Sequence, residues 1–230
     1  MRVLSFDTST EWLTVAAGDG LWWATRLERA GPANSERILP AIDAVLHEAG
    51  WRLADLDGIA FGAGPGAFTG VRVACSVAQG LALGADLPVV AIPTLLALAQ
   101  QAFLDHAAKR VFACLDARMR EVYVAFYSRR GEAWQTEGEP AVLNPVEVSA
   151  PAGAGWEGAG DGFVAYPALA SLPGVASAHG DTHPTARAIG ELALPRLASG
   201  EGVAASEAVP LYVRHRVALT TAERDAGARL

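Results

Sequence analysis

Cysteine and lysine are scarce in this chain, and the scarcity of cysteine excludes two kinds of structural site. The 230 residues hold two cysteines, Cys75 and Cys114, and a single lysine, Lys109. Two cysteines cannot build a disulfide framework or a four-ligand zinc site. Both stand in apolar surroundings, where cysteine usually serves as a small buried hydrophobic residue. We interpret the lack of lysine, beside plentiful arginine and alanine, as a bias of genomic composition that predicts no function.

An excess of positive charge is also lacking. The net charge of −7 argues against a free-standing nucleic-acid binder, because such proteins normally carry a basic face. The sequence shows no run of about 18 uncharged apolar residues that would predict a membrane span. The N-terminus lacks the basic segment and apolar core of a secretory signal. We therefore expect a cytoplasmic protein that makes no contact with membrane.

The most informative feature that is present is a loop of small residues at 62–72. Four glycines and a proline fall within its first nine residues, after the apolar run 59–61 and before a helix-like segment at 71–83. A strand, a rigid loop and a helix start can aim backbone N–H groups at an anion or at a neighbouring backbone. We favour a strand-to-helix turn that lets the next helix pack tightly against a partner. Arg72 is the residue that would hold an anion if the phosphate interpretation were right.

Hydrophobic periodicity predicts an α/β fold. Strands are expected over 2–7, 12–17, 21–26, 58–61, 88–92, 111–116 and 121–124, and helices over 35–49, 69–83, 94–107 and 183–199. Residues 140–148 suggest a strand and a short crossover, and residues 153–162 a glycine-rich loop or strand-loop. The segments 2–15 and 111–124 share one pattern, a strand that ends in aspartate followed by a polar turn and a second strand. This pattern predicts an actin-like fold (ASKHA, ribonuclease H-like) with two related halves, residues 1–100 and 101–230, in which the C-terminal segment packs back on the first half.

A working ATPase of this fold needs two phosphate-binding hairpins and carboxylates for Mg²⁺. Weak candidates for such a site are Asp7, Thr8, Ser9, Asp116 and Arg118. The first hairpin has no glycine in its turn, and the second carries bulky side chains after Asp116. We favour turn-forming roles for Asp7 and Asp116, since aspartate is common in turns of any kind. ATPase or kinase activity stays open as an alternative.

Other catalytic patterns are weaker. His179 and His183 are spaced for a shared metal on a helix, but Gly180 and Pro184 make a helix through both unfavourable. We expect a loop there and no metal site. The nucleophile elbow of a hydrolase, Gly-x-Ser-x-Gly, is absent from the sequence. Thr69 is predicted to cap the helix that it begins, so a protease-like hydrolase is the least favoured alternative.

Several short motifs occur together in an order that resembles the TsaB (YeaZ) family. They are Asp7-Thr-Ser-Thr10, Gly64-Pro-Gly-Ala-Phe-Thr-Gly-Val-Arg72, Ile92-Pro-Thr-Leu-Leu-Ala-Leu98, Leu115-Asp-Ala-Arg118 with Glu121-Val-Tyr123, and Pro210-Leu-Tyr-Val-Arg214. The resemblance implies a part in making threonylcarbamoyladenosine at position 37 of tRNAs that read ANN codons. It implies a non-catalytic subunit that works with TsaD, which transfers the threonylcarbamoyl group, and with TsaE, a small ATPase. One departure is Asn34, where members often carry a histidine.

The resemblance also implies where partners bind. TsaD-type proteins carry a metal-binding His-x-x-x-His on the helix that corresponds to residues 35–49, where this chain has only His47. The helices 35–49 and 70–83 are expected to form the interface with TsaD or with a second copy of the chain. The interface residues expected are Glu36, Leu39, Asp43, Leu46, Gly70, Ala74, Ala78 and Ala82. We expect no catalytic residue, no metal and no cofactor of its own. If ATP or ADP binds, we expect it at the interface of the complex. We expect tRNA to be contacted only through the complex. The cluster Arg214, His215 and Arg216 is interpreted as a solvated surface.

Overall fold

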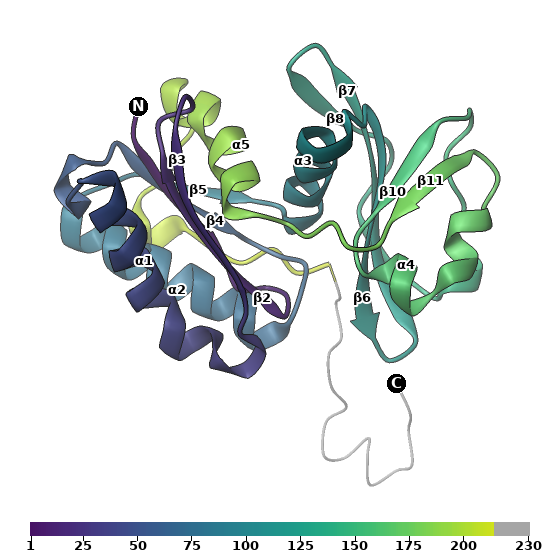
Figure 1. Cartoon of the computed structure of the whole chain (residues 1–230), viewed down its shortest axis with the longest axis horizontal. Coiled ribbons are helices and arrows are strands. Elements are labelled where there is room, and N and C mark those ends of the chain that lie inside the picture. Colours follow the sequence, from purple (N-terminus) through teal and green to yellow (C-terminus); the bar gives the residue numbers. More distant parts are fainter. Residues whose placement is uncertain (214–230) are drawn as a thin grey trace, which may run out of the picture.

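The computed structural model describes residues 1–213, so the cluster at Arg214, His215 and Arg216 lies outside the described residues. Two sheets stand side by side (Figure 1). The first contains β1 (Val3–Asp7), β2 (Trp12–Gly18), β3 (Trp23–Arg29), β4 (Gly58–Gly62) and β5 (Val89–Ile92). Its strand order is β3-β2-β1-β4-β5, with β1 antiparallel to β2 and parallel to β4. The first half therefore begins with the three-stranded meander that the sequence predicts.

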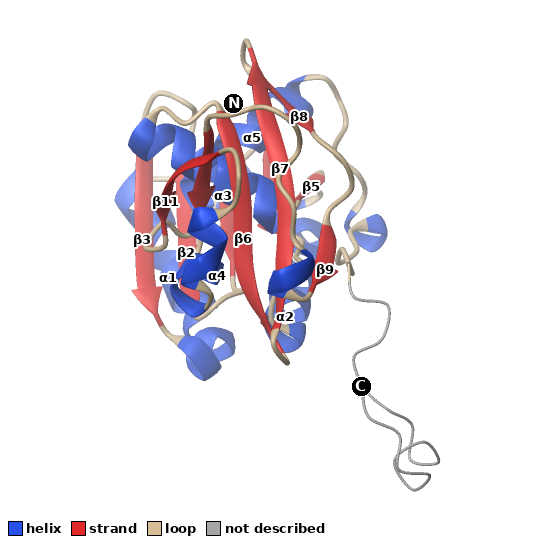
Figure 2. Cartoon of the chain, turned by 90° about the vertical axis from the view of Figure 1, so that its right-hand side faces the viewer, coloured by secondary structure: helices blue, strands red, loops and turns tan. Residues whose placement is uncertain are grey.

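The second sheet repeats this topology. It contains β6 (Arg110–Arg118), β7 (Glu121–Arg130), β8 (Ala133–Thr136), β10 (Trp156–Ala159) and β11 (Val175–His179). Its order, β11-β10-β6-β7-β8, matches the first when β6 is set on β1, and β6 is likewise antiparallel to β7 and parallel to β10. The short β9 (Ala141–Leu143) and β8 pair with opposite ends of the long β7 (Figure 2). The prediction of two related halves is confirmed.

Within residues 1–213, five α-helices cover the sheets: α1 (Asn34–Ala49), α2 (Phe68–Ala85), α3 (Thr94–His106), α4 (Gly162–Ala165) and α5 (Ala186–Ala198). In Figure 1, α1 and α2 lie on one face of the first sheet and α5 on the other. Alternation along β1 explains this arrangement, since Leu4 and Phe6 belong to the core under α1 and α2, whereas Val3 belongs to the core under α5. Helix α3 packs on the second sheet, and the expected division at residue 100 falls within it.

Several element boundaries differ from the prediction for local reasons. The strand expected at 21–26 begins at Trp23, because Asp19 Oδ1 accepts the N–H groups of Leu21 and Trp22 at 2.9 Å each and holds them in a turn. Helix α2 begins at Phe68, and its N-cap position, Ala67, makes no side-chain hydrogen bond. The prediction that Thr69 caps this helix is therefore wrong. Strand β10 lies in the segment expected to be a loop or strand-loop, and strand β11 was not predicted; both strands are short and rich in small residues.

Among the described residues, α2 has the length and composition of a membrane-spanning helix, with a mean hydropathy of 1.2 over 18 residues. A third of that window is buried inside the protein. The buried positions of α2 belong to the core beneath the first sheet, which accounts for part of its apolar character. Val73, Val77 and Leu81 pack partly against the same core, whereas Phe68 and Leu83 are exposed.

Candidate functional site

A cavity of about 960 Å³ opens between the two halves. The first half lines it with the β1–β2 turn, the glycine loop and the start of α2; the second half lines it with the end of β6 and with Asp161. The chain returns to the cavity with Leu211, Tyr212 and Val213. In an actin-like fold the two hairpin turns face each other across this space. If the chain bound a nucleotide as an ATPase of this fold does, the phosphates would lie in this cavity.

The glycine loop packs against the β1–β2 turn and leaves no room for a ligand between them. Thr8 Oγ1 donates to the carbonyl of Gly70 at 2.7 Å, and the N–H of Ala67 donates to the carbonyl of Ser9 at 2.6 Å. A Cβ on Gly66 would lie 2.3 Å from the Ser9 carbonyl oxygen, and one on Gly70 would lie 1.9 Å from that of Thr8. Only glycine permits such an approach. These glycines therefore serve backbone-to-backbone packing, as in the turn interpretation favoured above.

Asp7 points into the protein and does not line the cavity. One carboxylate oxygen accepts the N–H of Ser9 at 2.5 Å, and the other accepts the Thr94 hydroxyl at 3.2 Å. A Cβ on Gly62 would lie 2.0 Å from Asp7 Oδ2. Burial raises the pKa of Asp7, although the hydrogen bonds from Ser9 and Thr94 oppose that change. The carboxylate thus joins the end of β1 to the start of α3, which is a structural role.

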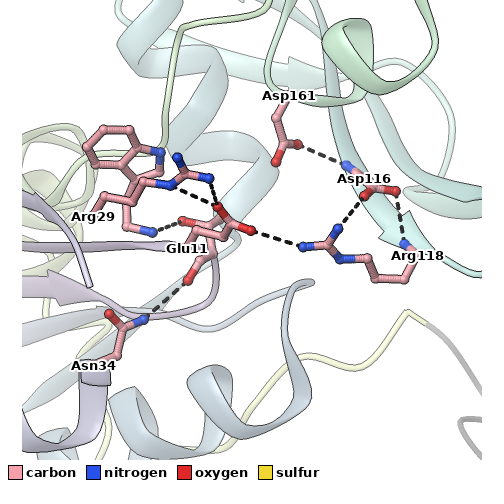
Figure 3. A network of polar contacts seen from close by, with 8 residues as sticks. Glu11, Arg29, Asn34, Asp116, Arg118 and Asp161 are labelled. Atoms are coloured by element: carbon pink, nitrogen blue, oxygen red, sulfur yellow. Dashed lines mark hydrogen bonds and ion pairs between the residues drawn. The ribbon is translucent and has the colours of Figure 1, made fainter. Parts of the chain in front are cut away.

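Arg118 crosses the cavity and is held by carboxylates from both halves (Figure 3). Its guanidinium lies 3.2 Å from Asp116 in its own strand and 3.2 Å from Glu11 in the β1–β2 turn. Glu11 also pairs with Arg29 at 2.6 Å. Arg29 first, and Arg118 with it, lower the pKa of Glu11. The arginine that was a candidate for phosphate binding thus already has two anionic partners, and its side chain lies between the two turns.

The turn that carries Arg118 has an unusual backbone. Arg118, Met119 and Arg120 all have positive φ values, of 61°, 52° and 62°. Three successive side-chain-bearing residues in this region are uncommon and cost conformational energy. Nearby, the N–H of Asp116 donates to Asp161 at 2.9 Å, and burial raises the pKa of Asp161. The second hairpin thus presents bulky side chains, as the sequence predicted.

His179 and His183 face different partners. The His179 ring stacks on His106 with centroids 3.7 Å apart, and its Nε2 lies 3.6 Å from Glu157. The His183 ring stacks on Trp12 at 4.3 Å, and burial lowers its pKa. Within residues 1–213, no group of three His, Cys, Asp or Glu side chains is arranged to hold a metal. The loop expected between the two histidines follows the end of β11.

The expected partner surface needs a correction on α2. Its small-residue stripe is buried in the core of the first half and comprises Gly70, Ala74, Ala78 and Ala82. These residues let α2 approach its own sheet, so they are not available to a partner helix. On α1, Glu36, Leu39 and Asp43 are exposed, whereas Leu46 packs partly against the same core. The stripe was misassigned because helical spacing does not tell which partner a small-residue face meets.

The outer face of α2 carries a second set of small residues that sequence reasoning missed. Ser76, Gly80 and Gly84 are exposed at intervals of four residues, beside Leu83, which is 78% exposed. A Cβ on Gly80 or Gly84 would meet nothing within 4 Å. Glycine inside a helix is unfavourable by about 1 kcal/mol relative to alanine. Within the described residues, no neighbouring atom requires glycine at position 80 or 84. Two exposed glycines in a helix that needs neither of them are the signal from which this face could have been predicted.

Comparison with known proteins identifies relatives over most of the chain. Residues 28–210 match the family model described as TsaD, tRNA N6-adenosine threonylcarbamoyltransferase. An Escherichia coli K12 protein named tRNA threonylcarbamoyladenosine biosynthesis protein TsaB is 38% identical over 223 residues, covering 95% of this chain and 96% of that protein. The Haemophilus influenzae protein of the same name is 49% identical over 126 residues, 54% of this chain and 52% of that protein. The solved structure of YeaZ from Pseudomonas aeruginosa is 40% identical, with a TM-score of 0.86 over 92% of this chain and 99% of that one.

Proposed function

The chain belongs to the TsaB family, and on that premise we propose that it is the non-catalytic subunit that activates a separate TsaD-type transferase. Its product would be threonylcarbamoyladenosine at position 37 of tRNAs that read ANN codons. The chain would supply no reacting group. Its part is to bind the transferase through the outer faces of α1 and α2 and to hold it in an active conformation.

The geometry of the cleft supports a non-catalytic role. Asp7 is turned inward, and Arg118 is paired with Glu11 and Asp116 between the two turns. A phosphate in that position would have to displace an ion pair and would meet a turn without a free backbone cradle. A stand-alone ATPase, kinase or hydrolase therefore finds less support here than an accessory subunit. We propose that the chain requires no cofactor or metal of its own and that ATP or ADP, where present, binds at the interface with the transferase.

The outer face of α2 is the observation that carries the proposal. A Cβ on Gly80 or Gly84 would meet nothing within 4 Å; Gly80 lies in the interior of the 18-residue helix α2, and Gly84 is its last residue but one. Helix glycines allow another helix to come closer than any side chain would permit. Leu83, which is 78% exposed, adds apolar area to this face of α2, and Leu39, which is 54% exposed, adds apolar area on α1. Glycines on this face destabilise the helix of the isolated chain, and their presence is explained if a partner helix packs against them.

The proposal also includes a second copy of the chain, a TsaE-type ATPase and tRNA as partners. A second copy of the chain would compete with the transferase for α1 and α2, so a homodimer and the active complex would exclude each other. A TsaE-type ATPase would join the assembled complex. Since the net charge of the chain is −7, tRNA would be held mainly by the other subunits. We place the assembly in the cytoplasm.

A matched pair of substitutions tests this proposal. Leu83→Arg introduces a charge on the proposed face, and Val146→Arg introduces the same charge at an 88% exposed valine of the second half. We expect Leu83→Arg to abolish co-purification with the TsaD-type subunit and formation of modified tRNA, and Val146→Arg to leave both unchanged. Equal behaviour of the two variants would contradict the assignment of the face.

A further inference from the structure

An aromatic and arginine cluster lies at the mouth of the cleft. The Arg72 guanidinium carbon lies 3.2 Å from the Phe68 ring centroid and 5.0 Å from that of Tyr212. Phe68 is 51% exposed and Tyr212 is 49% exposed. The cluster thus presents two half-exposed rings with a cation between them.

The rings are held in place by the rest of the chain. Phe68 is the first residue of α2, and Arg72 Nη1 donates to its carbonyl at 3.0 Å. Tyr212 follows Leu211, whose N–H donates to the carbonyl of Ala63 at 2.7 Å. Val213, the next residue, packs against the core of the second half. Tyr212 is therefore anchored on both sides, and the exposure of its ring does not arise from a loose segment.

The chemistry of the cluster fits an unpaired nucleobase. Unstacked RNA bases are typically held on aromatic side chains and on arginine planes. Within residues 1–213, Arg72 forms no ion pair with a carboxylate, so guanidinium N–H groups are left for a phosphate.

The position of the cluster also separates it from the docking face. Phe68 and Gly80 are twelve residues apart on α2, which at the helical rise places them roughly 18 Å from each other. A ligand on Phe68 and Tyr212 can therefore bind at the cleft while a partner helix covers Gly80. The two sites lie toward opposite ends of one helix.

We propose that Phe68, Arg72 and Tyr212 form a stacking site for an unpaired base of the tRNA anticodon loop, next to the adenosine that is modified. This inference rests on the proposed function, which supplies the RNA. The rings take the base, and Arg72 takes a phosphate of the same strand. The site is a positioning site, since none of its residues reaches a reacting atom in this proposal.

The test uses the complete assembly of this chain with its transferase and ATPase partners. The double variant Phe68→Ala/Tyr212→Ala removes both rings, and Phe68→Tyr/Tyr212→Phe keeps them as the control. Since stacking on one aromatic side chain contributes about tenfold to RNA affinity, we expect the double alanine variant to raise the KM for tRNA at least tenfold. We expect kcat, the melting temperature and the affinity between subunits to stay unchanged, and the control to behave as wild type.

A second measurement reads the stacking directly. An anticodon stem-loop carrying 2-aminopurine beside the target adenosine should lose fluorescence on binding to the wild-type assembly and not to the double alanine variant. An unchanged KM in that variant would overturn the inference, and so would a loss of affinity between subunits that accounts for the whole effect. A wild-type assembly that forms no product would overturn the proposed function and this inference with it.

Discussion

The backbone carbonyl of Thr8 lies 1.9 Å from the point that a Cβ on Gly70 would occupy, and the Thr8 hydroxyl donates to the Gly70 carbonyl at 2.7 Å. The first hairpin turn and the first turn of α2 are thus joined backbone to backbone. This junction sets where α2 leaves the cleft, and with it where the outer face of the helix is presented.

Gly70→Ala should destabilise the protein. The added methyl group would overlap the Thr8 carbonyl, so either the turn or the helix must move, which we expect to lower the free energy of unfolding by about 1–3 kcal/mol. Chemical denaturation of the isolated chain measures this. A stability equal to that of the wild type would show that the junction is not tight.

The same substitution at Gly80 should have the opposite effect on stability. A Cβ there meets nothing within 4 Å, and alanine is the better helix former, so Gly80→Ala should raise the free energy of unfolding by about 0.5–1 kcal/mol. It should also weaken binding to the transferase, because the methyl group holds the partner helix away. Calorimetric titration of the two subunits checks the second effect. A gain in stability with unaltered binding would remove Gly80 from the interface.

Asp7 should make stability depend on pH in a defined direction. Burial raises the pKa of Asp7 above 3.8 in the folded chain, so the stability it contributes is full below that value and is lost as pH rises through the folded pKa. Relative to Asp7→Asn, the wild type should therefore become less stable as pH increases above about 4. Denaturation midpoints of both proteins over this range provide the measurement.

Asp55 supplies a control of opposite sign. Arg52 lowers the pKa of this partly exposed carboxyl from 3.8 to about 2, so its contribution is present at neutral pH and is lost as pH falls through about 2. The difference between wild type and Asp55→Asn should thus shrink in acid, whereas the difference for Asp7→Asn moves the other way. Parallel behaviour of the two pairs would contradict the structural role given to Asp7.

The ion pairs of Arg118 should matter little for folding. Its side chain is mostly exposed, so Arg118→Ala should change the free energy of unfolding by less than about 1 kcal/mol, and high salt should reduce that change further. Calorimetric titration of the isolated wild-type chain with Mg²⁺-ATP should give no saturable binding. Tight binding with turnover by the isolated chain would support the ATPase alternative instead.

Much of the fold could be predicted from the sequence because its signals are local. The apolar run in Val3–Asp7 reflects a strand that is buried on both faces, and the helical spacing of Ile38, Ile42 and Val45 reflects one buried helix face. Asp7 at the end of β1 and Asp116 near the end of β6 marked the repeat of the halves. Strand β11 was missed and β10 was expected only as part of a loop or strand-loop, since their small residues carry little hydrophobic pattern and β10 pairs with β6, which is far away in the sequence.

The site was harder to predict for a related reason. Spacing identified a small-residue stripe on α2, but only the three-dimensional structure tells that Ala74 and Ala78 meet the protein's own core while Gly80 and Gly84 face outward. The pairing of Arg118 with Glu11 joins residues 107 positions apart, and no local pattern announces it. Contacts between the two halves therefore decide whether Arg118 is available to bind a phosphate in the cavity.

The central claim is that this chain activates a transferase through the outer face of α2 and does no chemistry itself. The most direct measurement is the amount of threonylcarbamoyladenosine formed on an ANN-reading tRNA by the purified TsaD-type and TsaE-type subunits, alone, with the wild-type chain, and with Leu83→Arg. We predict product only with the wild-type chain. Full product without the chain, or equal product with Leu83→Arg, would contradict the claim.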